Sequence, residues 1–474
     1  MPHPRRAKIV ATLGPSTSDA PSLKRLIGAG ADVLRINLAH GDPPEHARIV
    51  HLAREVAKEA GRTVAFLADL PGPKMRTGPI AGGEVYLRAG EPFVLAAGEH
   101  YGDDRRVGTS VHGLASLVTP GDEIFLSDGA IVLEVDRTDG GDVLTRVLRG
   151  GALRSRKGMH VPGAEGRLEA VTEGDLTAVM GAAALGAELL GLSFVRTAND
   201  LERLRASLPD GYRPFVISKI ETRGAIDNLD EIIEVSDGVM IARGDLGIQT
   251  PLASVPELQR RIIRACNRAA TPVITATQLL ESMTRAPLPT RAEVSDVTTA
   301  VREGTDALML SEETAIGDDP GLVLETMDQV IRAAESTPND HSDPVGDRSD
   351  DLVSWGVAHA ATVAAADVGA RAILCPTRTG STPRRVAAFR PRAEVIGFAS
   401  GGAGLGALCL TWGVIPVPMD LPDDETIATE ALARALDRGI VVPGDRIVIV
   451  AGSRPGSTDT MQVATVTNGA STHT

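Results

Sequence analysis

Two stretches of this chain, Phe215-Val-Ile-Ser-Lys-Ile-Glu221 and Gly238-Val-Met-Ile-Ala-Arg-Gly-Asp-Leu-Gly247, indicate its architecture. Each begins as a short apolar, β-branched segment, which is typical of a parallel strand buried on both faces. Each then changes abruptly into charge, with Lys219 and Glu221 closing the first and Asp245 following the second. If both are strands of one β/α barrel, these charges meet at its C-terminal rim, where barrel active sites lie. A divalent cation held by the two carboxylates would bridge them to an anionic substrate.

A charge after a strand is also common in an ordinary solvated loop. Three charges converging at adjacent strand ends are harder to explain in that way. Gly244, between Arg243 and Asp245, favours the functional interpretation because a glycine lets a ligand approach the backbone closely.

Composition excludes several classes of function. The chain has 474 residues, 43% of them hydrophobic and 23% charged, which is enough for two to three soluble globular domains. Its 62 acidic and 48 basic residues give a net charge of −14, which argues against a nucleic-acid or anionic-membrane surface. With 3% aromatic residues, little is available for stacking on bases.

The cysteines and the apolar segments predict a cytoplasmic protein. Cys266, Cys375 and Cys409 are scattered without zinc or disulfide spacing, so we expect buried free thiols in a reducing compartment. The apolar stretch after Lys8 ends at Gly14-Pro15, too short for a secretory leader. No apolar run reaches the length of a membrane span.

Alternating strand and helix patterns predict a (β/α)8 barrel in residues 1–70 and 157–338, with one inserted domain. Three strands before the insertion and five after it make the eight of a closed barrel. The insertion, residues 71–156, opens with Pro71-Gly72-Pro73 and carries short alternating stretches among turns, which predicts a small β-barrel lid over the active rim. The barrel strands are expected at residues 8–13, 33–38, 65–70, 188–195, 215–221, 239–243, 273–277 and 307–311.

A polar, proline-bearing linker at residues 337–346 separates a last domain, residues 339–474. Its strands, expected at residues 372–375, 395–398, 414–417 and 446–450, suit an open doubly wound α/β sheet. The glycines of residues 401–406 do not complete a dinucleotide fingerprint, so a tight turn opening a small helix is the better interpretation.

Several long motifs resemble those of the pyruvate kinase family, in the order in which that family carries them. They span nearly the whole chain, and the barrel, inserted lid and C-terminal regulatory domain of the family coincide with the organisation above. The matching stretches are Lys8-Ile-Val-Ala-Thr-Leu-Gly-Pro15, Leu34-Arg-Ile-Asn-Leu-Ala-His-Gly41, Ile217-Ser-Lys-Ile-Glu221, Ala242-Arg-Gly-Asp-Leu-Gly247, Ala276-Thr-Gln-Leu-Leu-Glu-Ser-Met283 and Pro289-Thr-Arg-Ala-Glu293.

The resemblance implies phosphoryl transfer from phosphoenolpyruvate to ADP, giving pyruvate and ATP in the last step of glycolysis. Such transfer depends on positioning and charge neutralisation. By the resemblance, Glu221 and Asp245 hold Mg²⁺ or Mn²⁺, and Lys219 stabilises the phosphoryl group in flight. The backbone from Ala242 through Gly244 to Asp245 and the hydroxyl of Thr277 would seat the substrate carboxylate.

Other implied roles compete with structural ones. Thr277 lies where the family passes a proton to the enolate, although a threonine in a strand is by itself unremarkable. Arg35 is expected to be catalytic and, with Arg76, to contact phosphate, but either could form an ordinary salt bridge. Asn37, His40 and Lys157 match nucleotide or phosphate positions, with Pro15 and Asp128 nearby, and His40 alone could be structural.

The monovalent-cation site of the family is altered here. Asn37 and Asp69 remain, but Ala39 and Leu70 stand at the serine and threonine positions, and Lys74 replaces a usual glutamate. We therefore predict that the Lys74 ammonium substitutes for potassium and that the enzyme does not need this ion. The competing interpretation makes Lys74 a solvated loop residue.

Three other positions depart from the pattern of the family, so a preference for ADP over other diphosphates does not follow from the resemblance. Glu312 stands where glycine is usual, Ile316 where a lysine is common, and His160 where an asparagine is common.

The C-terminal domain resembles the regulatory domain of the family. Thr377, Arg378, Thr379, Gly380, Ser381 and Thr382 follow a strand and open a helix, which suits a sugar-phosphate or AMP effector. Simple N-capping by Ser381 or Thr382 is the alternative. The family is commonly homotetrameric, so a homotetramer is expected.

Two other functions stay open at this point. A metal-dependent pyruvate-enolate aldolase or lyase on the same barrel also uses a Glu and Asp pair, but needs neither a lid nor Lys219. A non-catalytic effector-sensing scaffold would not need Lys219, Glu221, Asp245 and Thr277 intact.

Overall fold

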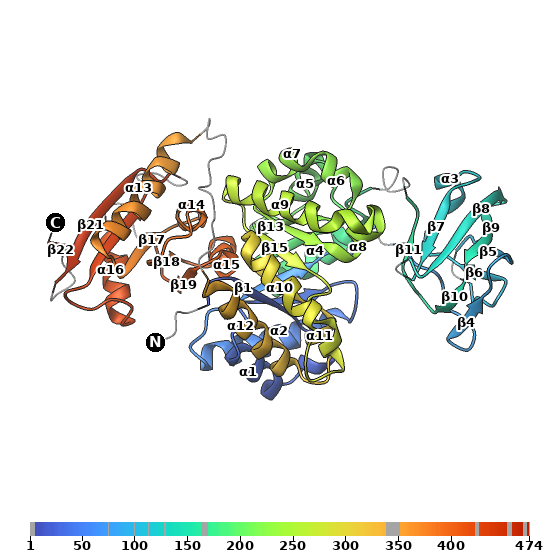
Figure 1. Ribbon diagram of the computed structural model, residues 1–474, viewed down its shortest axis with the longest axis horizontal. Helices are drawn as coiled ribbons and strands as arrows, with labels where there is room; N and C mark the ends of the chain where they lie inside the picture. Colours follow the sequence, from blue (N-terminus) through green and yellow to red (C-terminus); the bar gives the residue numbers. More distant parts are fainter. Residues whose placement is uncertain are drawn as a thin grey trace.

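A computed structural model of the chain shows three domains in a row (Figure 1). The barrel lies in the middle, and the lid and the C-terminal domain lie at opposite ends of it. The structure describes residues 5–73, 75–98, 100–111, 113–127, 129–162, 169–337, 351–421, 426–452, 457–467 and 472–473. Most of the expected linker, and Lys74 and Asp128, fall outside the described residues.

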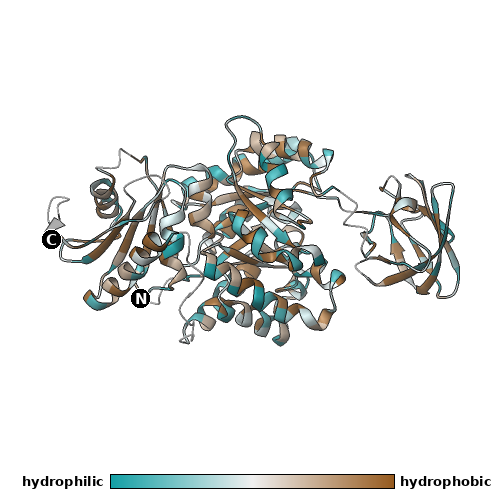
Figure 2. Ribbon diagram, turned by 90° about the horizontal axis from the view of Figure 1, so that it is seen from above, coloured by the Kyte–Doolittle hydropathy of each residue, from teal (hydrophilic) through white to brown (hydrophobic). Residues whose placement is uncertain are grey.

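The predicted barrel is confirmed: eight parallel strands close in the order β1-β16-β15-β14-β13-β12-β3-β2. Their residues are almost all buried, and Figure 2 shows the strands as hydrophobic segments inside a ring of more polar helices. Burial on both faces explains why these strands have no alternating pattern. The strands are β1 (Lys8–Thr12), β2 (Val33–Asn37), β3 (Ala65–Asp69), β12 (Leu189–Leu192), β13 (Phe215–Ile220), β14 (Gly238–Ala242), β15 (Val273–Ala276) and β16 (Ala307–Leu310).

Helices follow the barrel strands, and several of them begin after a residue whose side chain caps them. Asp19 Oδ1, for example, accepts from the Ser22 amide at 2.8 Å, and α1 starts directly after Asp19. The barrel helices are α1 (Ala20–Gly28), α2 (Pro43–Glu59), α4 (Glu173–Leu185), α5 (Ala198–Ala206), α6 (Arg223–Asp227), α7 (Leu229–Val235), α8 (Arg243–Gln249), α9 (Val255–Ala269), α10 (Arg291–Glu303), α11 (Glu312–Ala315) and α12 (Pro320–Glu335).

The lid is an all-β insertion with a hydrophobic core of its own. A six-stranded sheet, β11-β7-β8-β9-β5-β6, curls without closing, and β10 pairs with β4 beside it, so the expected small barrel is a half-barrel. The elements are β4 (Glu84–Leu87), β5 (Pro92–Ala96), β6 (Arg106–Gly108), α3 (Leu114–Leu117), β7 (Glu123–Leu126), β8 (Ile131–Asp139), β9 (Asp142–Arg149), β10 (Gly151–Arg154) and β11 (Met159–His160).

The C-terminal domain is a mixed sheet in the order β19-β18-β17-β20-β21-β22, with hydrophobic clusters on both faces. The four strands expected from the sequence are parallel, whereas β21 and β22 are antiparallel additions that the sequence reading missed. The elements are α13 (Leu352–Val368), β17 (Ala372–Pro376), α14 (Ser381–Ala388), β18 (Glu394–Ala399), α15 (Gly402–Leu410), β19 (Val414–Pro418), α16 (Ile427–Asp437), β20 (Arg446–Ala451), β21 (Thr460–Val466) and β22 (Thr472–His473).

Helix α15, opened by the glycine run, closes the N-terminal mouth of the barrel. Ala407, Cys409 and Leu410 belong to the same buried cluster as the inward side chains of the barrel strands. A Cβ on Gly406 would lie 2.8 Å from Leu189 Cδ2, so this close approach requires glycine. The C-terminal domain therefore completes the core of the barrel.

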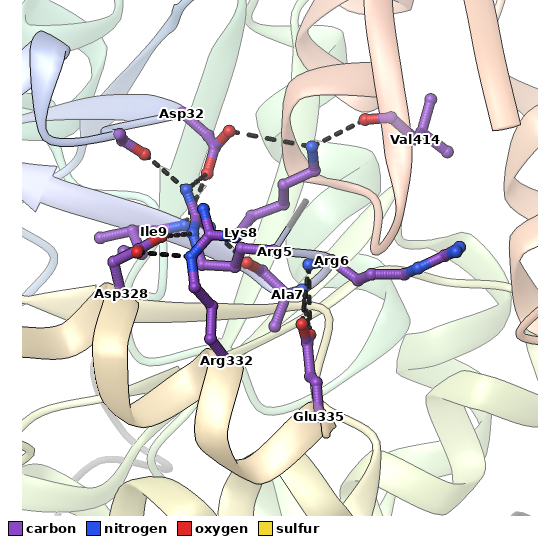
Figure 3. Close-up of polar contacts among 11 residues, drawn as sticks. Arg5, Arg6, Ala7, Lys8, Ile9, Asp32, Asp328, Arg332, Glu335 and Val414 are labelled. Atoms are coloured by element: carbon purple, nitrogen blue, oxygen red, sulfur yellow. Dashed lines mark hydrogen bonds and ion pairs between the residues drawn. The ribbon is translucent and has the colours of Figure 1, made fainter. Parts of the chain in front are cut away.

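The N-terminal segment ties the same two domains together (Figure 3). The ammonium of Lys8, at the start of β1, donates to the Val414 carbonyl at 2.7 Å and lies 3.8 Å from Asp32. Arg5 pairs with the other Asp32 oxygen at 2.9 Å, and Glu335 of α12 accepts the Ala7 amide at 2.7 Å. Polar contacts of the N-terminal segment thus lie beside the apolar contact between α15 and the barrel mouth.

The three cysteines are free and buried, as predicted. Among the described residues, no helix is both long enough and apolar enough to cross a membrane.

Candidate active site

Lys219 lies at the centre of a polar cluster inside the C-terminal end of the barrel. Its Nζ donates to Ser193 Oγ at 2.7 Å and lies 3.4 Å from Asp69 Oδ1 and 3.6 Å from Glu221 Oε2. Burial alone would lower the pKa of Lys219, but the carboxylates of Asp69 and Glu221 outweigh it and raise the pKa. The ammonium is therefore charged and held in one place.

Glu221 is fully buried just past the end of β13. One oxygen, Oε1, accepts the Phe194 amide at 2.6 Å. Burial raises the pKa of Glu221 to about 7, with Lys219 opposing the shift and Asp245 adding to it. Its other oxygen, Oε2, is shielded from solvent and has no hydrogen-bond partner among the described residues. A buried carboxylate oxygen in this state is suited to a cation.

Asp69, at the end of β3, connects Lys219 to Arg35 of β2. Arg35 holds Asp69 Oδ2 with Nη2 at 2.7 Å and Nε at 2.8 Å, and its Nη1 reaches Thr12 Oγ1 at 3.0 Å. Burial opposes ionisation of Asp69, but Lys219 and Arg35 outweigh it and lower the pKa of this carboxyl. Arg35 and Lys219, which are both expected to contact phosphate, are thus held in place by the carboxylate of Asp69.

Thr277 and Gly244 meet across the rim between β15 and α8. Thr277 Oγ1 accepts the Gly244 amide at 2.9 Å, and Thr277 has a φ of 69°, a left-handed conformation rare for a β-branched residue. Arg243 holds this turn, donating to the Ala276 carbonyl at 3.2 Å and to the Thr277 carbonyl at 2.5 Å. Backbone strain kept in place by a buried guanidinium is common at functional sites.

Helix α8 begins directly after Ala242, the last residue of β14, and Asp245 lies in its first turn. The charge of Asp245 acts on both Lys219 and Glu221, so it lies within electrostatic range of them. Among the described residues, no group of three or more His, Cys, Asp or Glu side chains could enclose a metal. Glu221 and Asp245 alone fit Mg²⁺, which is usually held by one or two carboxylates and completed by water and substrate oxygens.

Several predicted site residues lie apart from this cluster. Arg76 and Lys157 sit at the base of the lid, where Arg76 Nη1 contacts the Arg156 carbonyl at 3.4 Å and Lys157 donates its amide to Thr77 Oγ1 at 3.0 Å. His40 is exposed after β2, and Asn37 Oδ1 accepts the Ala39 amide at 3.1 Å. The contacts of Arg76 and Lys157 are thus made at the base of the lid, whereas Asn37 is the register partner of Asp69, which lies 3.4 Å from Lys219.

Two positioning residues were missed by the sequence reading. Ser193 and Phe194 were assigned to a strand reaching residue 195, but β12 ends at Leu192. The Ser193 hydroxyl donates to the Leu70 carbonyl at 2.7 Å, and Phe194 adopts a φ of 55° that aims its amide at Glu221. The sequence did contain a sign of this role: Ser193 is a polar residue that follows an apolar segment, and Lys219 was singled out because it closes another such segment.

His160 joins the lid to the barrel. It belongs to β11, and its Nδ1 lies 3.0 Å from Gln249 Nε2 at the end of α8. Burial lowers the pKa of His160 to about 4, with Asp245 opposing the shift, so the ring is neutral at physiological pH.

The predicted effector loop is compact. Helix α14 is capped by Gly380, at a φ of 82°, without a side-chain hydrogen bond, so N-capping by Ser381 or Thr382 is wrong. Thr377 Oγ1 accepts the Gly380 amide at 2.9 Å, Thr379 Oγ1 lies 3.1 Å from Ser381 Oγ, and Thr382 bonds Thr458 at 2.8 Å. Arg378 is exposed.

A cavity of about 470 Å³ lies outside the cluster, between the segments that follow β1 and β16. Ser16, Arg25 and Asp318 are among its lining residues, and Arg25 pairs with Asp319 at 2.7 Å. The cavity borders Gly317, next to Ile316, and therefore adjoins the region expected for the nucleotide.

Comparisons with known proteins agree across both large domains. A family model described as the pyruvate kinase barrel domain matches residues 4–323, and one described as the pyruvate kinase alpha/beta domain matches residues 356–464. A pyruvate kinase of Thermococcus litoralis is 38% identical over 462 residues, covering 96% of each chain. One of Methylorubrum extorquens is 39% identical over 473 residues, covering 98% of each, and one of Geobacillus stearothermophilus is 39% identical over 480 residues, covering 98% of this chain and 81% of that protein.

Proposed function

Because this chain belongs to the pyruvate kinase family and is a phosphotransferase, we propose that it transfers a phosphoryl group from phosphoenolpyruvate to ADP. The observation that carries this proposal is the Lys219 ammonium, fixed between Asp69 and Glu221 beside the solvent-shielded Oε2 of Glu221. A held cation next to a carboxylate suited to a metal is what a migrating phosphoryl group needs.

In the proposed reaction, the phosphorus–oxygen bond of phosphoenolpyruvate breaks and a new one forms to a β-phosphate oxygen of ADP. The enolate left behind takes a proton at its methylene carbon and becomes pyruvate. Lys219 and Arg35 face the phosphoryl oxygens, and the Thr277 hydroxyl with the backbone of Ala242, Gly244 and Asp245 seats the carboxylate. Thr277 also orders the water path that delivers the proton.

Glu221 and Asp245 would hold Mg²⁺ or Mn²⁺, consistent with the divalent-metal use of the family. When bound, the ion neutralises negative charge on the substrate oxygens. The amide of Phe194 keeps Glu221 oriented, with Oε2 left over for the ion.

Pyruvate formation from phosphoenolpyruvate tests the proposal against its two competitors. In an assay coupled to pyruvate reduction, the enzyme should form pyruvate only when ADP and a divalent ion are both present. Pyruvate formed without ADP, or aldol cleavage of a pyruvate adduct, would indicate the aldolase or lyase instead. A protein inert with every substrate would be the scaffold.

We further propose that turnover does not require potassium. Asp69, which belongs to the predicted remnant of the monovalent site with Asn37, already faces two side-chain cations, Arg35 and Lys219. Lys74, the proposed substitute, lies outside the described residues. Activity in tetramethylammonium buffer should be unchanged when potassium is added, and strong activation by potassium would exclude this proposal. Lys74→Glu is expected to create a potassium requirement.

A sugar phosphate or AMP is the proposed effector of the loop from Thr377 to Thr382, and a homotetramer is the proposed assembly. Support for the effector comes from Thr379 and Ser381, whose hydroxyls lie 3.1 Å apart at the opening of α14, where Thr379 Oγ1 also accepts the Ser381 amide at 3.4 Å. Binding of ribose 5-phosphate, fructose 1,6-bisphosphate and AMP can be compared by calorimetry on wild-type enzyme and Ser381→Ala. Light scattering gives the assembly.

A further inference from the structure

A small cavity lies between the N-terminal face of the barrel and the C-terminal domain, at the opposite end of the barrel from Lys219. Its polar lining comes from both domains: Asn267, Thr271 and Asp306 from the barrel, and Arg384, Arg390 and Thr411 from the other side. The cavity has a volume of about 10 Å³, measured as the space open to the centre of a water molecule, so it has room for one small species.

Arg390 enters this interface with its side chain 10% exposed. Its Nη2 donates to the Gly304 carbonyl at 2.6 Å and to Asn267 Oδ1 at 3.2 Å, and its guanidinium stacks on Trp412 at 4.5 Å. Nη1 is shielded from solvent and has no hydrogen-bond partner within the described parts of the chain. One donor of a buried cation is therefore unused.

Arg384 repeats this arrangement on the same side of the cavity. Its Nη1 donates to the Asp237 carbonyl at 3.0 Å, and its guanidinium lies 5.4 Å from the Phe215 ring. Its Nε is also shielded from solvent, again without a partner among the residues that the structure describes. A buried donor left unpaired costs free energy, so one such donor on each of two arginines that line the same cavity indicates a missing acceptor.

The charges around the cavity do not balance. Asp306 is the carboxylate in the lining, and its oxygens already accept the Val273 amide at 3.0 Å and the Trp412 amide at 3.2 Å. Asp237 reaches Arg384 through its carbonyl, because its carboxylate pairs with Arg205 at 2.8 Å. Within the lining, the two guanidiniums thus face one carboxylate, whose Oδ1 also lies 3.6 Å from Arg390 Nη2. Asp237 and Glu335 act on them from outside the lining.

The pKa values of Arg384 and Arg390 agree with this excess of positive charge in the lining of the cavity. Burial lowers the pKa of Arg384 to about 10, with Asp237 opposing the shift. Burial also lowers the pKa of Arg390, although Asp306 and Glu335 oppose it. The nearby carboxylates thus compensate only part of the desolvation of each guanidinium.

We propose that this cavity binds one small monovalent anion of chloride size, which accepts from Arg384 and Arg390 and fastens the C-terminal domain to the barrel. An anion supplies both the missing acceptor and the missing charge. Because the lining comes from two domains, the anion binds only when they are docked, so it stabilises the assembled molecule by mass action.

Bromide tests the site directly, because it replaces chloride and scatters anomalously. Crystals of the full chain grown in sodium bromide should show an anomalous peak within contact distance of both guanidiniums. A water-sized peak without anomalous signal at that position, or no peak, would overturn the proposal.

Thermal unfolding tests the consequence in solution. At equal ionic strength, the unfolding midpoint of the full-length enzyme should be higher in sodium chloride than in sodium gluconate, whose anion is too large for the cavity. Arg384→Gln should lose this difference. Arg385→Gln is the matched control, because the neighbouring arginine pairs with Asp351 at 2.7 Å and does not line the cavity.

Two outcomes contradict the proposal in solution: equal midpoints of the wild type in both salts, or a chloride effect that persists undiminished in Arg384→Gln. If Arg384→Gln does not fold, the wild-type comparison and the bromide crystal still decide.

Discussion

At the scale of single residues, the site works through charges that hold one another. Lys219 is positioned by three oxygens, from Ser193, Asp69 and Glu221, before any substrate binds. In the phosphoryl transfer proposed above, such preorganisation means that the ammonium need not be reoriented. The same contacts make the contribution of each residue testable.

Lys219→Met should reduce phosphoryl transfer by at least about a thousandfold, because it removes the cation that faces the migrating group. Protonation of added enolpyruvate should be largely retained, since that step develops no charge near the ammonium. Coupled assays of the two half-steps, with Lys58→Met on the exposed face of α2 as control, measure this. If both steps fail equally, Lys219 has a structural role.

Ser193→Ala should lower kcat by about 10- to 100-fold, because a hydrogen bond to a charged group is worth about 1.5–3 kcal/mol. The thermal midpoint should change little, and Ser193→Thr should restore part of the activity by returning a hydroxyl. Ser207→Ala is a suitable control, since that hydroxyl also donates to one carbonyl, Leu204 at 2.7 Å, away from the site. Unchanged kcat in Ser193→Ala would show that Asp69 and Glu221 position Lys219 without help.

At the scale of elements, the loops and helix ends decide where functional groups point. Strand β12 stops at Leu192, and the left-handed turn that follows delivers both the Ser193 hydroxyl and the Phe194 amide. Helix α15 is short and almost wholly apolar because it packs against the barrel mouth on one side and its own sheet on the other.

Gly406→Val should destabilise the enzyme by about 1–3 kcal/mol, as is usual when extra carbons enter a packed interior. Its Cβ would lie 2.8 Å from Leu189 Cδ2 and force α15 away from the barrel. Denaturant unfolding measures the change. Gly356→Ala on α13, where a Cβ meets no atom within 4 Å, is the control and should be neutral or stabilising. Equal stability of Gly406→Val and the wild type would contradict the close packing.

The start of α10 predicts a pH-dependent contribution. Glu293 Oε2 accepts from Thr290 and Oε1 accepts the Ser282 amide at 2.8 Å; burial opposes ionisation, but these bonds outweigh it and lower the pKa. A lowered carboxyl pKa adds stability above the unfolded pKa of about 4.3, and this stability disappears as the pH falls through the folded pKa.

Glu293→Gln should therefore cost about 1 kcal/mol at pH 7, as is typical of a lost cap, and progressively less below pH of about 4. Unfolding midpoints across this range, with Glu234→Gln as an exposed control, measure the effect. A cost independent of pH would mean that the charge of Glu293 is irrelevant.

At the scale of the whole molecule, the two appended domains differ in how they depend on the barrel. The lid has its own core and joins the barrel through short segments, whereas α15 shares a core with the barrel strands. Polar contacts of Lys8 with the Val414 carbonyl and of Arg6 with the Pro391 carbonyl reinforce the second junction.

Removing the C-terminal domain and removing the lid should consequently have opposite effects on the stability of the barrel. A chain ending at residue 337 should be insoluble or unfolded, because it uncovers the apolar barrel mouth. A chain in which residues 77–157 are replaced by two glycines should stay folded but inactive, since the Thr77 amide and Lys157 carbonyl are already 2.9 Å apart. Circular dichroism and thermal unfolding compare the two, and a stable, cooperative unfolding of the first would refute the shared core.

The sequence alone predicted the barrel, the lid and the C-terminal domain, and it placed Lys219, Glu221 and Asp245 at strand ends of the barrel, because buried parallel strands and strand-end charges are local patterns. It could not predict what depends on neighbours in space. The end of β12, the orienting bonds from Ser193 and Phe194, and the pairing of Asp69 with both Arg35 and Lys219 required the folded chain. The same holds for α15 inside the barrel mouth, since contacts between segments far apart in the chain leave no periodicity in either segment.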